Sequence, residues 1–269
     1  LVEADVEVVN LTRYELFIPE KRPFFLEGNE RYSQRISQFY SRRIGDIPWG
    51  GKATGTAGRF EYGAVVATED LPSTDGGEAR RAEYGIARLQ YGLPRGSNIG
   101  FLGADRYLDG SHQGSIGLDT TFFMTDTLGL TGQLLRVHGP TAAGGLAWFL
   151  RPAYDSATTH FHLRYTSLDQ DIKDDLNAVG FLRDDDRREV DANLTRTFWF
   201  ERSTVERLTP GVNYNRFYSQ DGELRSWELD ANVDLGMAVP QGVMASVYHE
   251  LGPRWALLGN VGWQQWSQF

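Results

Sequence analysis

The chain has 269 residues, a net charge of -9 and no cysteine. The acidic balance argues against a nucleic-acid partner, since phosphates require a basic surface, and the lack of cysteine excludes disulfides and thiolate chemistry. No run of residues approaches the roughly 18 to 20 apolar residues that a membrane-spanning helix requires, which excludes a helical membrane protein.

Residues 1–50 are expected to hold an N-terminal strand and then a segment that is not a strand. Between residues 16 and 44, charged and aromatic side chains recur with neither the helical nor the strand period. We predict that this segment is ordered and lies at the periplasmic end of the protein or inside it as a plug. Its charged residues predict an ion-pair network that fixes the segment against the strands, or, in a sharper interpretation, gates a substrate. They are Glu20, Lys21, Arg22, Glu27, Arg42 and Arg43.

Residues 51–269 predict about a dozen antiparallel strands. Residues 84–93, 115–124, 159–168 and 226–235 alternate between apolar and polar side chains, as a strand between two different environments must. Turn-forming pairs such as Asp109-Gly110 and Asp221-Gly222 separate strands of this kind. Soluble strands usually have about 5 to 6 residues, whereas a tilted membrane strand needs about 9 to 11. The predicted strands are of the longer kind.

Two of these strands carry polar rows opposite apolar rows. Phe161 and Leu163 share one face of their strand, and Trp227 and Leu229 share one face of theirs. We predict that the polar residues on the opposite faces line a water-filled lumen; they are His160, His162, Arg164, Glu228, Asp230 and Asp234.

The fold expected from these patterns is all-β: an antiparallel up-and-down transmembrane β-barrel, complete or truncated, with a non-strand N-terminal segment. Trp148, Trp199 and Trp227 lie in or near the ends of predicted strands, as expected for the aromatic girdles of membrane barrels. The alternative is a soluble β-sandwich, in which the apolar rows would line a dry interior between two sheets.

Four strings resemble one bacterial family. Residues 10–27 (NLTRYELFIPEKRPFFLE), 39–45 (FYSRRIG), 50–55 (GGKATG) and 177–183 (NAVGFLR) are similar to an outer-membrane β-barrel domain of unknown function that follows family-9 carbohydrate-binding modules. The similarity runs over about residues 1–235. It implies a place in the outer membrane of Gram-negative bacteria and transfers no catalytic or ligand-binding residue.

The last residues resemble a different family. Residues 239–250 and 255–269 are similar to a late hairpin of the FadL-like long-chain fatty-acid transporters. Two resemblances in one chain indicate a composite or truncated sequence, with a seam near residues 235–240.

No motif identifies a catalytic centre. His160 and His162 are spaced to ligate a metal from one strand face, but no third ligand is evident, and we favour a lumen-facing role. The aspartates of residues 169–186 lack the EF-hand pattern and predict a solvated acidic loop. Neither a nucleophile elbow nor a phosphate-binding loop is present. We therefore assign no catalytic residue, metal or cofactor, which favours a non-enzymatic role.

Three functions follow as expectations. The first is a porin-like channel or transport role for small or hydrophobic solutes or glycans, with the lipid bilayer of the outer membrane as partner. The second is a membrane anchor for a carbohydrate-binding or carbohydrate-processing module. The third is a soluble β-sandwich binding domain.

Overall fold

The computed structural model describes residues 14–72, 80–142, 144–201, 204–237, 245–252 and 255–261. The chain divides into two compact units. The first comprises Leu1–Phe123, Thr131–Leu150 and Thr166–Arg188, and the second comprises Met124–Leu130, Arg151–Tyr165 and Glu189–Phe269. None of the helices in the described ranges has the length and apolar character needed to cross a membrane.

Strands dominate both units. The N-terminal segment, residues 14–48, holds only the short helices α1 (Pro23–Leu26), η1 (Asn29–Tyr32) and η2 (Ser41–Arg43). Two further short helices are η3 (Pro94–Gly96) and α2 (Lys173–Leu176). The strands are β1 (Trp49–Ala57), β2 (Phe60–Leu71), β3 (Arg80–Gly92), β4 (Asn98–Leu108), β5 (Ser111–Phe123), β6 (Leu128–His138), β7 (Leu146–Asp155), β8 (Thr159–Leu168), β9 (Arg187–Arg196), β10 (Phe198–Trp199), β11 (Val205–Tyr218), β12 (Leu224–Met237), β13 (Ala245–Gly252) and β14 (Trp255–Val261).

The order of the strands in the main sheet follows their order in the chain. β1 to β9 are successive neighbours, β9 pairs with β11, and β10 and β12 both pair with β11, which makes a 12-stranded sheet. β13 and β14 form a separate hairpin. The prediction of an all-β, antiparallel, up-and-down fold is confirmed.

The predicted closure into a barrel is not found in the described part of the chain. Closure requires the last strand to hydrogen-bond to the first, and β1 has β2 as its partner while β12 has β11. The sheet is therefore open as described. Residues 238–240, half of the proposed seam at 235–240, lie outside the described ranges, as do Trp263 and Trp266 of the C-terminal resemblance.

Turn chemistry explains why the strands reverse where they do. Asp109 and Gly110 both have positive φ angles, 51° and 82°, and join Leu108 to its partner Ser111. Two consecutive positive φ angles are the geometry of the tight hairpin turn whose twist matches the flanking strands. The Asp-Gly signal in the sequence therefore places the β4–β5 reversal correctly.

One face of the first unit's sheet carries exposed apolar rows, and we call it the open face. Antiparallel registers align Tyr62, Leu89, Phe101 and Leu118 across β2 to β5, and these side chains are 40% to 52% exposed. Two rows of the open face are more polar and lie toward one end of the strands. The row that includes Thr68 and Glu83 is one of them.

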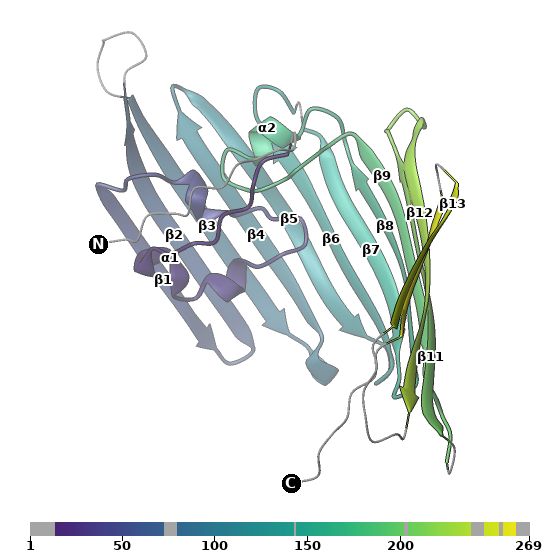
Figure 1. The fold of residues 1–269 in the computed structure, drawn as a ribbon. Helices are drawn as coiled ribbons and strands as arrows, with labels where there is room; N and C mark the ends of the chain where they lie inside the picture. The colour runs from purple at the N-terminus through teal and green to yellow at the C-terminus, as the bar shows by residue number, and fades with distance from the viewer. Residues whose placement is uncertain are drawn as a thin grey trace. The chain divides into compact units, whose positions relative to one another are not determined.

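The opposite face of this sheet, the covered face, holds the core. Residues that alternate with the open rows, such as Val65, Ile86 and Leu102, are buried. Figure 1 shows the N-terminal segment running across the sheet and α2 near the ends of its middle strands. Apolar side chains from these segments complete two clusters, which include Phe39 and Leu176. The N-terminal segment and α2 therefore pack against the covered face.

Candidate functional site

An ion pair lies at the centre of the covered face. The guanidinium of Arg88, on β3, binds both carboxylate oxygens of Asp119, on β5, with Nη2 to Oδ1 at 2.8 Å. Their side chains are 5% and 17% exposed. Gln34 of the N-terminal segment donates its amide hydrogen to Asp119 at 2.7 Å. A charged pair that is nearly removed from water is therefore shared with the covering segment.

Side-chain amides hold the same segment along its length. Gln133 of β6 accepts a hydrogen bond from the Ile36 N–H at 3.0 Å and donates one to the Ile36 carbonyl at 2.8 Å, as a neighbouring strand would. Gln38 donates to the Leu102 carbonyl at 3.2 Å and to the Ser115 hydroxyl at 3.1 Å. Because these groups are buried, losing one partner leaves the other unsatisfied. The segment is a fixed part of the first unit.

Glu20 and Arg22 form the centre of the predicted N-terminal network. The two side chains make two hydrogen bonds, at 2.8 and 3.0 Å, and the Ser41 hydroxyl donates to Glu20 at 2.6 Å. Arg22 also donates to the carbonyls of Ser41, Ile44 and Gly45. Burial alone would raise the pKa of Glu20, but the hydrogen bonds from Arg22, Ser41 and the backbone outweigh it and lower that pKa to about 2.

Three of the other predicted members, Glu27, Arg42 and Arg43, have partners that the sequence did not indicate. Arg43 pairs with Glu15 at 2.6 Å and donates to the Gly180 carbonyl, and Arg42 donates to the Pro19 carbonyl. The N–H of Lys21 donates to Glu20. Glu27 lies 3.3 Å from Lys52 of β1, whose ammonium also donates to two carbonyls of the segment. Glu15, Ser41 and Lys52 were missed because they are distant in sequence and follow no local pattern.

The acidic residues 169–186 are only in part the predicted solvated loop. Asp175 of α2 is fully buried and accepts hydrogen bonds from Gln113 at 2.9 Å and from the N–H groups of Thr141 and Ala142 at 2.8 and 2.5 Å. This carboxylate caps the turn between β6 and β7. The loop is thus anchored to the sheet from within.

The second unit carries a line of charged and titratable side chains across β7, β8 and β9. His160 and His162 lie 3.0 Å apart, between Nε2 and Nδ1, and their other nitrogens contact Asp155 and Asp191. Arg164 continues the line, with Asp191 at 3.3 Å. Glu189 completes it at 2.7 Å from Arg164.

The structure therefore brings together three of the predicted lumen-facing residues: His160, His162 and Arg164. Their partners Asp155, Asp191 and Glu189 were missed. The alternation within β9 was the available signal, since residues 189 and 191 share one face of a strand.

Glu228, Asp230 and Asp234, the other predicted lumen residues, share one face of β12. They pair in register with Asn215, Asn213 and Thr209 of β11. Asp234 also contacts Arg207. The opposite face of this strand pair is apolar: Val233, Leu229 and Trp227 are 42% to 47% exposed. In both units, therefore, the side chains of such strands alternate between an apolar face and a polar or covered face.

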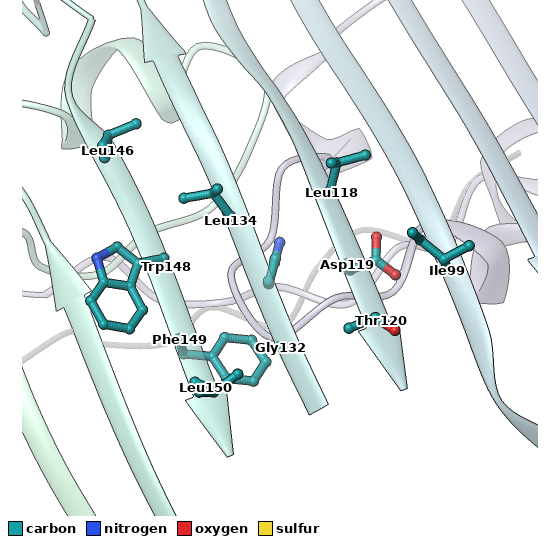
Figure 2. Close-up of a pocket in the computed structure, with 11 residues that line it drawn as sticks. Ile99, Leu118, Asp119, Thr120, Gly132, Leu134, Leu146, Trp148, Phe149 and Leu150 are labelled. Atoms are coloured by element: carbon teal, nitrogen blue, oxygen red, sulfur yellow. The ribbon is translucent and has the colours of Figure 1, made fainter. Parts of the chain in front are cut away.

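A shallow groove of about 550 Å³ crosses the open face of the first unit (Figure 2). Gly132 is among the residues that line it. Its lining is chiefly apolar and includes Ile99, Leu118, Leu134, Leu146, Trp148 and Leu150. Within the described ranges, no group of three or more His, Asp or Glu side chains is arranged to hold a metal ion.

Comparison with known proteins gives one finding. A family model described as a domain of unknown function, DUF5916, matches residues 2–62. This range contains the strings at 10–27, 39–45 and 50–55 and, of the described residues, covers the N-terminal segment, β1 and the first residues of β2. The string at 177–183 lies beyond it, and the match carries neither the carbohydrate-binding association nor the FadL-like resemblance. No curated protein and no solved structure matches the chain.

Proposed function

We propose that this chain is a protein of the bacterial outer membrane whose strands cross the lipid bilayer. The supporting observation is the alternation between exposed apolar rows and polar or covered rows. Transferring a side chain such as Leu or Phe out of water contributes about 1.5 to 3 kcal/mol, so the row of Tyr62, Leu89, Phe101 and Leu118 is costly in water. Contact with lipid chains removes that cost.

The alternative of a soluble β-sandwich requires a second sheet on the apolar rows. In the described residues these rows are exposed: Leu118 retains 52% and Leu89 retains 46% of its accessible surface. Soluble monomers rarely expose a contiguous apolar patch larger than a few hundred Å². The observation therefore favours the membrane proposal.

For the role of the protein, we infer a channel or transport function for small or hydrophobic solutes or glycans. Its support is the polar face of the second unit, where His160, Arg164, Glu228 and Asp230 alternate with apolar residues. Charged side chains along one face of membrane strands select what passes beside them.

A second candidate, a membrane anchor for a carbohydrate-binding or carbohydrate-processing module, has an observation of its own. The covered face of the first unit is filled by the N-terminal segment, which Gln133 and Asp119 bind directly. A filled face favours a structural role over an open pore.

Single-cysteine variants test the membrane proposal, because the chain has no cysteine of its own. Leu229→Cys and Val233→Cys test the apolar face of β12, and Glu228→Cys and Asp230→Cys test its polar face. All four positions are exposed, so a hydrophilic thiol reagent would label them equally if both faces met water. In lipid vesicles we expect labelling of positions 228 and 230 and protection of 229 and 233. Equal labelling of the four would refute the proposal, and urea-unfolded protein gives the reference rate.

Bilayer conductance separates the two roles. A channel gives discrete conductance steps that change when Glu228 and Asp230 are replaced by Gln and Asn. A protein that inserts with the labelling pattern above but conducts no ions and takes up no solute is an anchor.

A further inference from the structure

The two histidines of β8 are held in an unusual arrangement by their neighbours. His160 Nδ1 contacts the carboxylate of Asp155 on β7, and His162 Nε2 lies 2.7 Å from Asp191 Oδ1 on β9. The remaining nitrogens, His160 Nε2 and His162 Nδ1, face each other at 3.0 Å. Each ring is thus fixed at its outer nitrogen by a carboxylate, and the inner nitrogens converge.

The two carboxylates determine which ring nitrogens carry a hydrogen. An ionised carboxylate only accepts hydrogen bonds, so each outer nitrogen must carry a hydrogen. A neutral imidazole has one such hydrogen, which leaves a lone pair on each inner nitrogen. Two lone pairs facing each other at 3.0 Å repel, unless a cation lies between them. That cation is either an added proton or a metal ion.

We propose that His160 Nε2 and His162 Nδ1 bind one divalent transition-metal ion of the zinc, copper or nickel class. Zinc–nitrogen bonds of about 2.0 to 2.1 Å at a tetrahedral angle place two ligand nitrogens about 3.3 Å apart. The inner nitrogens need to separate only by a few tenths of an ångström. Asp155 and Asp191 then act as the carboxylates that orient metal-binding imidazoles and raise their basicity.

The surrounding charges are compatible with a bound cation. Asp155, Asp191 and Glu189 supply three carboxylates, while Arg164 and Arg151 supply the positive charges that face the pair. The net charge of these five groups is one negative charge, which a bound cation offsets. Two imidazoles leave the other coordination positions to water or to a solute on the polar face. This site is independent of whether the strands lie in a membrane.

Zinc binding by the full-length protein, purified without a polyhistidine tag, tests the proposal. Competition against a chromogenic chelator should give one zinc ion per chain, and cobalt should give the visible absorption of an imidazole-bound ion. Replacing both histidines, H160Q with H162Q, should abolish binding. The single variants D155N and D191N keep both ligands and should weaken affinity by about 10- to 100-fold.

A second pair of histidines supplies the matched control. His112 and His138 each lie 2.7 Å from a different oxygen of the Asp105 carboxylate, so one carboxylate holds both rings. H112Q with H138Q should leave zinc affinity unchanged. The proposal is overturned if the wild-type chain binds no zinc, in which case the pair shares only a proton, or if the control loses as much affinity as H160Q with H162Q.

Discussion

Glu20 illustrates how one carboxylate organises a segment that has little regular structure. Its oxygens accept hydrogen bonds from the Arg22 side chain, the Ser41 hydroxyl and the N–H groups of Lys21 and Arg22. The segment between α1 and β1 thereby folds back on its own beginning. All of these bonds favour the ionised carboxylate, which is why the pKa of Glu20 falls from 4.5 to about 2.

This pKa predicts a pH dependence of stability. Because the pKa is lower in the folded protein than in the unfolded chain, the carboxylate stabilises the fold fully above about pH 4.5 and loses that contribution as the pH falls toward 2. We expect Glu20→Gln to lower the free energy of unfolding at pH 7 by about 1 to 2 kcal/mol, allowing for solvent screening. The difference between variant and wild type should shrink as the pH falls from 4.5 to 2.

Thermal unfolding in detergent micelles at several pH values measures this effect. Glu30→Gln, an exposed glutamate of the same segment, is the control and should change the midpoint little. A difference between Glu20→Gln and wild type that stays constant from pH 7 to pH 2.5 would contradict the assignment.

The sequence predicted which kinds of residue matter here but not their pairing. Six charged residues of the N-terminal segment were expected to form a network. Glu20 and Arg22, two positions apart, bind each other through their side chains, whereas Glu27 and Arg43 pair with Lys52 and Glu15, outside the predicted set. Likewise, nothing local distinguishes Asp175 from the neighbouring aspartates, yet it alone among the described residues 169–186 is a buried aspartate. Tertiary packing selects the partner in each case.

At the scale of the elements, strands were predictable and the covering segment was not. β8 begins and ends where the alternation does, at Thr159 and Leu168, because period two is a local property of the sequence. The docking of the N-terminal segment is nonlocal. It depends on contacts such as the backbone hydrogen bond from Phe181 to the Ser37 carbonyl, between residues far apart in the chain.

That contact gives a prediction for Gly180. A Cβ atom there would lie 2.4 Å from the Ser37 carbonyl oxygen and 3.0 Å from that of Leu176, so the two segments would have to separate. We expect Gly180→Ala to lower the free energy of unfolding by about 1 to 3 kcal/mol, as overpacking in a tight interior does. Limited proteolysis should then cut residues 28–48 faster than in the wild type.

Gly85→Ala on β3 is the control for Gly180→Ala. A Cβ at that position meets no atom within 4 Å, so stability and cleavage should be unchanged or slightly improved. Equal cleavage rates in the Gly180 and Gly85 variants would show that the close approach to Ser37 does not hold the segment.

For the whole molecule, the alternation indicates that the two faces of the sheet meet different surroundings, and it was readable from the sequence because residues 84–93, 115–124, 159–168 and 226–235 each repeat it. Whether the sheet closes into a barrel could not be predicted from the sequence. It depends on which strands lie at the two edges and on their register, and a period-two pattern carries neither. The sequence therefore predicted the sorting of side chains better than the shape of the sheet.

The medium that the open face meets is tested by placing a charge on it. Leu89 lies in the central apolar row of β3, and Glu83 lies on the same face of the same strand in the polar row. If lipid covers the open face, Leu89→Arg should cost about 2 to 4 kcal/mol of folding free energy in vesicles, whereas Glu83→Arg should cost about 1 kcal/mol or less.

Leu89→Ala separates the loss of contacts with Tyr62 and Phe101 from the effect of the charge. In water, an arginine at an exposed strand position changes stability by only about 0.5 kcal/mol. A penalty for Leu89→Arg no larger than that for Leu89→Ala would therefore mean that the apolar rows are solvated, because only a medium of low polarity penalises the charge beyond the lost contacts.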